Sequence, residues 1–171
     1  VQTTRRRDGN RWRVLAHSEH LSDFLTQATG LTEGPSAAKK QVPEVILRSP
    51  KSVQAAVLRA LVDADGYAGE QGAISSTSSE MLGRQVQLML MNFGVLNRRR
   101  EQSDGCWHVH VTGRSAERFA DEIGFGLERK QEKLAGYLEE REWFNSESWT
   151  DEVVDLEEGR GDVYDISVEE T

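Results

Sequence analysis

The sequence predicts a protein of the α+β class, in which antiparallel strand pairs alternate with helices. The first observation is a segment that occurs twice, once from Arg5 to Phe24 and again from Arg98 to Phe119. Each copy holds three arginines, an Asp-Gly turn, a tryptophan and, twelve residues after it, a phenylalanine. The second observation is that strand-like alternation around each tryptophan changes to helical spacing afterwards. Because Asp-Gly between alternating stretches indicates a hairpin, each copy predicts strand, turn, strand and helix.

The remaining elements follow from the apolar spacing. It predicts helices at about Glu19–Thr29, Ser52–Asp63, Ser78–Phe93, Ser115–Ile123 and Leu127–Arg141. A strand is expected near Ala73–Thr77. Gly94 is expected to end the helix over Ser78–Phe93. Only the later copy is preceded by a helix, a strand and a second helix. The chain is therefore expected to begin in the middle of a protein with two repeats.

The charge is distributed unevenly along the chain, whose formal net charge is −8. Residues 1–100 hold 14 Lys and Arg against 9 Asp and Glu, a net of +5, whereas residues 101–171 hold 7 against 20, a net of −13. A basic part can bind phosphates even when the whole chain is acidic. Arginine outnumbers lysine by 16 to 5, and such acid-rich, lysine-poor composition resembles that of proteins from salt-loving archaea.

Cysteine content and hydropathy indicate an intracellular, reducing compartment, which we expect to be the cytoplasm of a prokaryote. Cys106 is the only cysteine, so no disulfide can form within the chain. No apolar run approaches the roughly 18–20 residues of a membrane span. Residues 1–7 also lack the apolar stretch of a signal peptide. We therefore expect no membrane partner.

Strand alternation predicts a sheet face rich in arginine and histidine. Around Val109, a tryptophan and valines alternate with histidines along one strand. Such a face can enter the major groove of DNA, where arginine pairs with guanine and with phosphates. The predicted DNA-binding residues are Arg5, Arg6, Arg7, Arg11, Arg13, Arg98, Arg99, Arg100, His108 and His110. Two alternatives stay open: a solvated sheet face, and a transition-metal site at Cys106, His108 and His110.

The helix over Ser52–Asp63 leads into two carboxylates, Asp63 and Asp65, and then into Gly66, which lets the chain turn into a strand. Carboxylates at a helix C-terminus are unfavourable beside the helix dipole unless a cation compensates them. Mg²⁺ prefers such ligands and binds substrate phosphates, which indicates phosphodiester hydrolysis. An EF-hand is excluded, because its glycine and final glutamate positions hold Ala68 and Ile74. A plain Asp-Gly turn stays open as the alternative.

These residues resemble the LAGLIDADG motif of homing endonucleases. The family word aligns with Leu58-Arg59-Ala60-Leu61-Val62-Asp63-Ala64-Asp65-Gly66, with alanine in place of its middle glycine. The resemblance implies that Asp65 is the catalytic metal ligand, that Asp63 has a supporting position, and that Leu58, Ala60 and Leu61 pack against a second such helix. Residues 39–46 resemble the lysine-containing segment ahead of that helix. Lys39 or Lys40 is therefore the candidate catalytic lysine, with a solvated linker as the alternative.

The resemblance implies the LAGLIDADG homing endonuclease fold, in which αββαββα repeats pack their motif helices together beneath an antiparallel β saddle that binds DNA. Each repeat contributes one acidic residue, and the two together cut both strands. We expect residues 1–48 to end the first repeat and residues 49–145 to form the second. Double-stranded DNA is the expected target, and Mg²⁺ is the expected cofactor. The missing first repeat, or a second copy of the chain, is the expected protein partner.

The C-terminal residues resemble the strands by which an intein returns to its splicing (Hint) domain. The matching stretches are Trp149–Gly159 and Gly161–Thr171, so residues 146–171 are expected to form return strands. For Val163–Glu169, an ordinary strand is the alternative. The sequence holds no Cys or Ser at its first residue and no His-Asn at its last two, which splicing would need. We therefore do not expect this chain to splice.

The leading functional hypothesis is a site-specific, Mg²⁺-dependent double-strand DNA endonuclease of an intein. Asp65 favours this enzyme, whereas the absence of a first motif predicts impaired activity in this chain. The first alternative is a LAGLIDADG module that binds DNA without cleaving it. The second is a protein-splicing element whose endonuclease has decayed.

Overall fold

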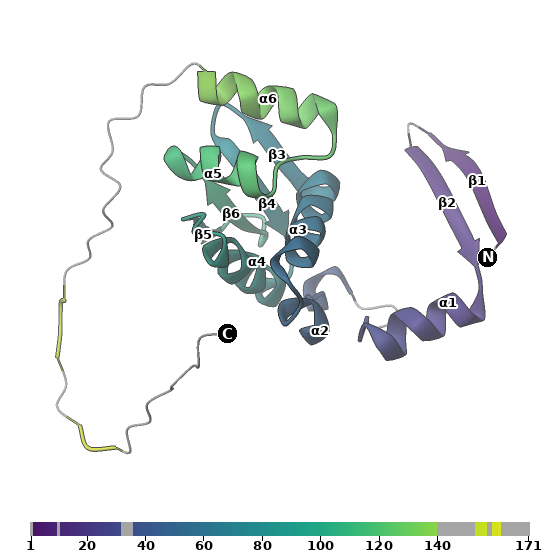
Figure 1. Cartoon of the computed structure of the whole chain (residues 1–171), viewed down its shortest axis with the longest axis horizontal. Coiled ribbons are helices and arrows are strands. Elements are labelled where there is room, and N and C mark those ends of the chain that lie inside the picture. Colours follow the sequence, from purple (N-terminus) through teal and green to yellow (C-terminus); the bar gives the residue numbers. More distant parts are fainter. Residues whose placement is uncertain (1, 10, 32–35, 140–152, 157–158, 162–171) are drawn as a thin grey trace.

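The computed structural model describes residues 2–9, 11–31, 36–139, 153–156 and 159–161. Within them the chain forms a two-stranded hairpin, a four-stranded antiparallel sheet and a set of helices, which confirms the α+β class (Figure 1). The expected return strands at 146–171 fall mostly outside these residues. The described stretches 153–156 and 159–161 form no strand. A strand needs a paired neighbour to be stable, so the return strands stay a prediction.

The hairpin consists of β1 (Gln2–Asp8) and β2 (Arg11–His17), which pair only with each other. It leads into α1 (Glu19–Asp23), which continues as one π-helical turn over Phe24–Ala28. The Ser18 hydroxyl accepts a hydrogen bond from the Leu21 N–H at 3.2 Å and so caps α1. The predicted hairpin and helix are therefore both present. In Figure 1 they lie to one side of the larger unit.

The larger unit starts with a 3₁₀ turn at Ala37–Lys39 and the short helix α2 (Glu44–Leu47). It continues with α3 (Lys51–Asp65), β3 (Gly66–Gly69), β4 (Gly72–Thr77), α4 (Glu80–Asn92), β5 (Arg98–Glu101), β6 (Trp107–Val111), α5 (Arg114–Glu122) and α6 (Glu128–Glu139). Hydrogen bonds join the strands in the order β3-β4-β6-β5, all antiparallel. The predicted helices are present, although α3 runs through Asp65, two residues beyond its expected end.

Local sequence explains the limits of α4. The Ser79 hydroxyl accepts from the Leu82 N–H at 3.2 Å at its start. At its end Gly94 adopts a φ of +69°, which only glycine tolerates without strain. The predicted glycine stop is therefore confirmed.

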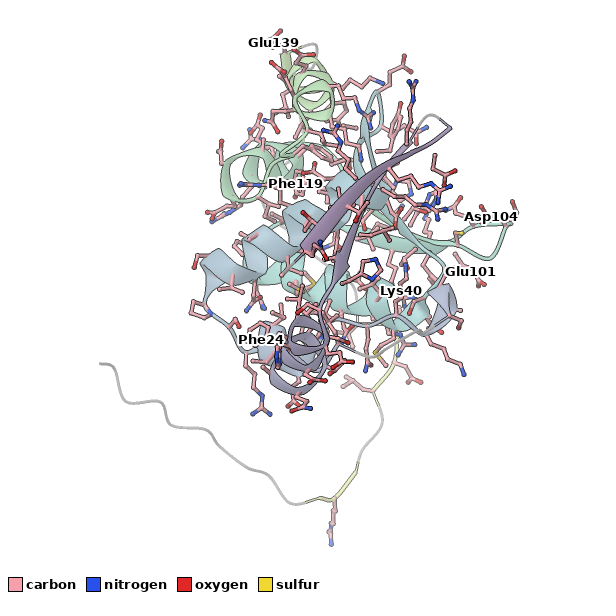
Figure 2. The ribbon with its side chains drawn as sticks, turned by 90° about the vertical axis from the view of Figure 1, so that its right-hand side faces the viewer. Phe24, Lys40, Glu101, Asp104, Phe119 and Glu139 are labelled. Carbon is pink, nitrogen blue, oxygen red and sulfur yellow. The ribbon has the colours of Figure 1, made fainter. Side chains whose placement is uncertain are left out.

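The core lies between the sheet and the four helices α3, α4, α5 and α6, which pack against it. Its most deeply buried large side chains include Leu58, Met89, Leu90, Val109, Phe119 and Leu134. Phe119 lies within the helical layer, whereas Asp104, at the tip of the β5–β6 turn, points away from it (Figure 2). Val109 and Val111 are buried, as the alternation predicts. All buried apolar residues of the described chain lie from Val42 to Tyr137, so this unit holds the core.

The two repeated hairpins differ in register. In the first, Arg5 pairs with Val14 across a short turn at Gly9. In the second, the longer β5–β6 connection pairs Arg99 with Val109. Because a shift of one residue moves every side chain to the opposite face, the middle arginine of the second triplet lies on the apolar face, whereas in the first triplet the outer arginines do.

Candidate active site

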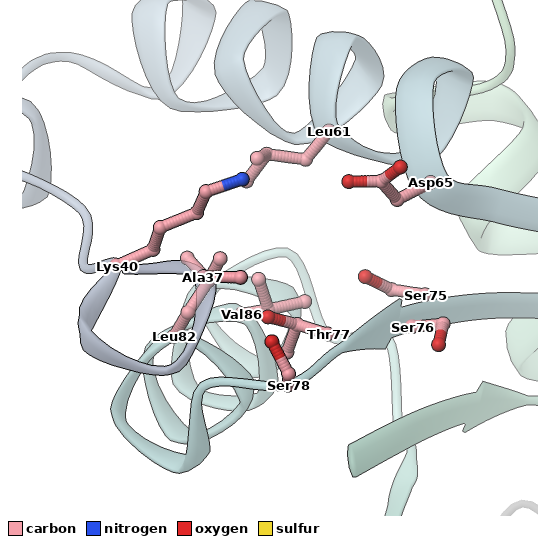
Figure 3. Close-up of a pocket in the computed structure, with 10 residues that line it drawn as sticks. All are labelled: Ala37, Lys40, Leu61, Asp65, Ser75, Ser76, Thr77, Ser78, Leu82 and Val86. Carbon is pink, nitrogen blue, oxygen red and sulfur yellow. The ribbon is translucent and has the colours of Figure 1, made fainter. Parts of the chain in front are cut away.

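α3 delivers Asp65 to a cavity of about 120 Å³ at the end of the sheet. Its polar lining consists of Lys40, Asp65 and the hydroxyl residues Ser75, Ser76, Thr77 and Ser78. The apolar wall is formed by Ala37, Leu61, Leu82 and Val86. Figure 3 shows the Lys40 side chain extending across this space towards the wall that carries Asp65. The structure therefore brings together an acid and a lysine that the resemblance singled out.

Hydrogen bonds to α4 hold the Lys40 segment at the cavity. The buried Ser79 hydroxyl donates to the Lys40 carbonyl oxygen at 2.5 Å. Gln85 bonds the backbone of Val42 twice, accepting from its N–H at 2.7 Å and donating to its carbonyl oxygen at 3.1 Å. Lys39 lies one residue earlier, exposed at the end of the 3₁₀ turn, and is not part of the cavity lining. Geometry therefore favours Lys40 over Lys39.

Asp63 faces a different part of the fold. Its carboxylate accepts hydrogen bonds from the backbone N–H groups of Gly126, at 3.0 and 3.1 Å, and of Leu127, at 3.2 Å. These amides precede α6, so Asp63 satisfies donors at the start of that helix. This contact agrees with a supporting position and separates Asp63 from the cavity residues.

Lys130 is a residue whose position the sequence did not reveal. We expect a lysine on a surface helix to be solvated, yet Lys130 is only 5% exposed. Its ammonium donates to the carbonyl oxygens of Val62, Asp63 and Gly66 at 2.7, 2.8 and 2.6 Å. Desolvation lowers the pKa of Lys130, and the charge of Arg129 lowers it further, against the opposing carboxylates of Asp63 and Asp65.

One sequence signal points to the burial of Lys130. It shares a helical stripe with the buried Leu134 and Tyr137, four and seven residues later. The Lys130 ammonium also explains how the unfavourable carboxylates at the C-terminus of α3 are compensated. Compensation at the C-terminus of α3 comes from a protein ammonium group as well as from any cation bound at Asp65.

The face of the sheet opposite the helices carries basic side chains. Register aligns Arg98 with His110 and Arg100 with His108 on neighbouring strands. A groove of about 400 Å³ beside them is lined by Leu96, Asn97, Arg98, Arg100, His110, Thr112 and Ser115. Burial lowers the pKa of His110, and the charges of His108, Arg100 and Arg98 lower it further. The two histidine rings lie 5.7 Å apart.

Arg99 lies on the other face of the sheet. Its guanidinium stacks over the Trp107 ring at 4.3 Å, and its side chain is 18% exposed. It also contacts Gln87 at 3.4 Å and Glu80 at 3.8 Å, both on α4. This placement removes Arg99 from the predicted DNA-binding surface, because register turns it towards the helices.

The first hairpin divides its arginines between two faces. Arg6 pairs with Arg13, and Arg7 pairs with Trp12, so Arg6 and Arg7 lie on opposite faces. Arg13 forms an exposed ion pair with Asp8 at 2.8 Å. Arg5, which pairs with Val14, lies on the same face as Arg7. Arg11 pairs with Asp8 in the same register.

The three residues expected to pack against a second motif helix differ in their surroundings. Leu58 is fully buried in the unit's own core, and Leu61 lines the cavity. Ala60 is exposed, as are Ala56 and Ala64. The small residues therefore mark a face of α3 that is exposed among the described residues, whereas Leu58 anchors the helix to its own sheet.

The donors at the cavity fit Mg²⁺ or a similar hard cation. Mg²⁺ is typically held by one or two carboxylates, with water and substrate phosphate completing its shell. Asp65 is exposed and offers one carboxylate, with serine and threonine hydroxyls beside it. In the part of the chain that the structure describes, no three His, Cys, Asp or Glu side chains gather as metal ligands, so nothing there supports zinc at Cys106, His108 and His110. The same residues include no helix long and apolar enough to cross a membrane.

Residues 52–124 match the sequence model of the LAGLIDADG-like domain. The A subunit of DNA gyrase from Mycobacterium gordonae is 40% identical over 115 residues, covering 64% of this chain and 21% of the relative. The small subunit of replication factor C from Methanocaldococcus jannaschii is 31% identical over 127 residues, covering 71% of this chain and 7% of the relative. The chain thus spans about a fifth or less of the length of these two relatives.

Solved structures of I-DmoI share the fold. The crystal structure of I-DmoI in complex with DNA and Mn has a TM-score of 0.59 and 16% identity, covering 72% of this chain and 63% of that chain. A structure of mesophilic variants from the homing endonuclease I-DmoI has the same TM-score with 18% identity, covering 72% and 62%. Residues 52–124 of the chain therefore form a LAGLIDADG-like domain, and the chain shares the fold of the homing endonuclease I-DmoI. The predicted resemblance to the LAGLIDADG family and the predicted fold class are confirmed.

Proposed function

We propose that this domain is a divalent-metal-dependent, site-specific DNA endonuclease carried by an intein. The observation that supports this most directly is the meeting of Lys40 and Asp65 at one cavity. These residues come from segments 25 positions apart in the sequence, and each was singled out by a separate part of the family resemblance. Their convergence at a cavity whose lining includes Ser76, the strand partner of His108 on the basic sheet face, supports cleavage of a bound phosphodiester.

Asp65 is the residue that would hold the cation, together with water and a phosphate oxygen of the DNA. A bound divalent cation supplies an activated water and stabilises charge on the leaving oxygen. The Lys40 ammonium, on the other side of the cavity, stabilises the negative charge that develops on the phosphate. Lys39 takes no part, because it is not in the cavity lining.

The basic sheet face would hold the DNA. Arg98 and Arg100 lie in line with His110 and His108 on one surface. Two arginines next to a groove can bind phosphates or guanine edges, whereas a neutral His110 can donate to or accept from a base. The complex of I-DmoI with DNA and Mn supports this assignment through the shared fold.

An intein origin is supported by the range of proteins that share this segment. Similar segments occur in differently named proteins from bacteria and archaea. They are the A subunit of DNA gyrase, the small subunit of replication factor C and the B subunit of the A-type ATP synthase. In each, the similar segment makes up 21% or less of the relative. A segment shared by otherwise different hosts is typical of an inserted element. The partner of α3 is then a second motif helix, from another repeat or another copy, packed on Ala56, Ala60 and Ala64.

The test is selection for cleaved sequences from a randomised duplex DNA library with the full chain and Mg²⁺ or Mn²⁺. We expect sequence-specific cleavage that Asp65→Asn abolishes, because the amide lacks the charge that binds the cation, and that Lys40→Met slows roughly 100-fold or more. Lys39→Met is the matched control and should cleave like the unmodified protein.

Binding measured in the same library separates the alternatives. Specific binding without cleavage by the unmodified chain would favour the non-catalytic DNA-binding module. Cleavage that persists in Asp65→Asn would contradict the role of that carboxylate.

A further inference from the structure

The end of α3 and the start of α6 are joined from both sides. From α3, the Asp63 carboxylate accepts from the backbone N–H groups of Gly126 and Leu127. From α6, the Lys130 ammonium donates to three carbonyl oxygens at the end of α3, those of Val62, Asp63 and Gly66. We call Asp63, Gly126 and Lys130 the α3–α6 clamp.

The clamp fixes the backbone on both sides of Asp65. The last carbonyl groups of a helix lack partners within it, and here one ammonium can give its three protons to three carbonyls at this junction. They are the carbonyls of Val62, which also accepts from the Gly66 N–H, of Asp63, and of Gly66 at the start of β3. Two of the bonded carbonyls, those of Asp63 and Gly66, flank Asp65 in the sequence. Because Lys130 is 5% exposed, water has little access to replace these bonds. The helix end is thereby held in one position just where the carboxylate enters the cavity.

We propose that the α3–α6 clamp sets the position of the Asp65 carboxylate, which makes Lys130 a positioning residue for the metal site. This inference rests on the proposed function, since it concerns the same carboxylate. Lys130 does not line the cavity, so it acts through the backbone of α3. Groups that orient metal ligands in this way commonly change metal affinity by 10–100-fold when removed.

The sign of the effect separates positioning from simple charge. The Lys130 ammonium bonds the carbonyls on both sides of Asp65, so its positive charge lies near the metal site and would repel a cation. If Lys130 acted only through its charge, Lys130→Met would strengthen metal binding and Lys130→Arg would leave it unchanged. If Lys130 positions Asp65, both variants weaken binding, because methionine has no donors and the planar guanidinium of arginine differs in shape from the ammonium.

The experiment measures Mn²⁺ affinity of the full chain from the paramagnetic broadening of NMR signals around Asp65, with thermal unfolding followed in parallel. We expect Lys130→Met and Lys130→Arg each to weaken Mn²⁺ binding roughly 10-fold or more. Arg129→Met, which removes the same charge from the neighbouring exposed residue, should leave the affinity unchanged. A lower unfolding temperature with unchanged Mn²⁺ affinity would mean that Lys130 is merely structural and would overturn the proposal.

Gly126→Ala tests the clamp without changing a charge. A Cβ at Gly126 would lie 2.7 Å from Asp63 Oδ2, so it displaces that carboxylate and should also weaken Mn²⁺ binding. If Lys130→Met fails to fold, Gly126→Ala tests whether the α3–α6 clamp affects Mn²⁺ binding.

Asp65→Asn distinguishes the proposed metal site from the proposed role of the clamp. If it leaves Mn²⁺ affinity unchanged, the proposed metal site is wrong; if it abolishes binding while the clamp variants do not weaken it, only the clamp is wrong.

Discussion

Single residues of the same type have different environments in this protein. Lys39 and Lys40 are both exposed, but only Lys40 lines the cavity, whereas Lys130 is buried against carbonyl oxygens. Arg98 and Arg100 are exposed on the basic face, whereas Arg99, between them, stacks on Trp107. Residue type therefore fixes the charge of a side chain, whereas the surrounding fold decides whether that side chain is buried, exposed or part of a cavity.

His110 makes stability depend on pH. Its pKa in the folded protein lies below its ordinary value of 6.5, mainly because of desolvation. The unfolded chain therefore binds a proton at higher pH than the folded one, so the free energy of unfolding falls as pH drops through 6.5 towards the lower folded pKa. Urea unfolding at a series of pH values should show this loss, and His110→Gln should reduce it. An unchanged pH dependence in that variant would contradict the assignment.

At the scale of elements, each helix owes its position to a small number of contacts. α3 is held to the sheet by Leu58 and Val62 and to α6 by the α3–α6 clamp. α4 fixes the Lys40 segment through Ser79 and Gln85. Register then decides which side chains of β5 reach the basic face.

The buried Leu58 should contribute more to the free energy of unfolding than an exposed leucine of the neighbouring helix α4. It is 0% exposed, so Leu58→Ala removes buried apolar contacts and leaves a cavity, at a cost of about 2–5 kcal/mol in the free energy of unfolding. Leu88→Ala is the control: Leu88 on α4 is 61% exposed, and its change should stay within about 0.5 kcal/mol. Chemical denaturation measures both, and equal losses would show that Leu58 is not the core anchor.

The arginines of β5 should separate DNA binding from stability. Arg98→Met or Arg100→Met should each reduce the salt dependence of duplex binding, lowering the slope of log K against log salt by about 0.9 for each phosphate that the variant no longer neutralises. Arg99→Met should leave that slope unchanged and lower stability by about 0.5–1 kcal/mol, because the stack on Trp107 is removed. Gel-shift titrations over salt concentration give the slopes. A reduced slope for Arg99→Met would show that Arg99 also contacts DNA phosphates, which would contradict this prediction.

At the scale of the whole molecule, stability and candidate chemistry reside in one unit. The buried apolar residues of the described chain lie from Val42 to Tyr137, and the cavity residues lie from Ala37 to Val86. β1 is exposed along its whole length, and α1 has no buried residue. The hairpin, with its own arginines, therefore adds surface rather than core.

A chain limited to residues 36–139 should fold on its own. Because it keeps every buried apolar residue of the described chain, its unfolding temperature should stay within a few degrees of that of the full chain. Its affinity for duplex DNA should fall if Arg6 and Arg13 bind phosphates. Calorimetry and gel shifts test the two statements separately, and loss of cooperative unfolding would show that residues outside 36–139 complete the core.

The amino-acid sequence by itself determined the fold class and the helices and strands, and it singled out Asp65 as the candidate metal ligand, because apolar periodicity, glycine stops and the motif are local properties of the chain. It also placed Lys39 and Lys40 together as candidates. Only the tertiary structure placed Lys40 but not Lys39 in the cavity lining, turned Arg99 away from the basic face, and buried Lys130 against the end of α3. These outcomes depend on strand register and on contacts between residues up to 68 positions apart, which no local pattern encodes.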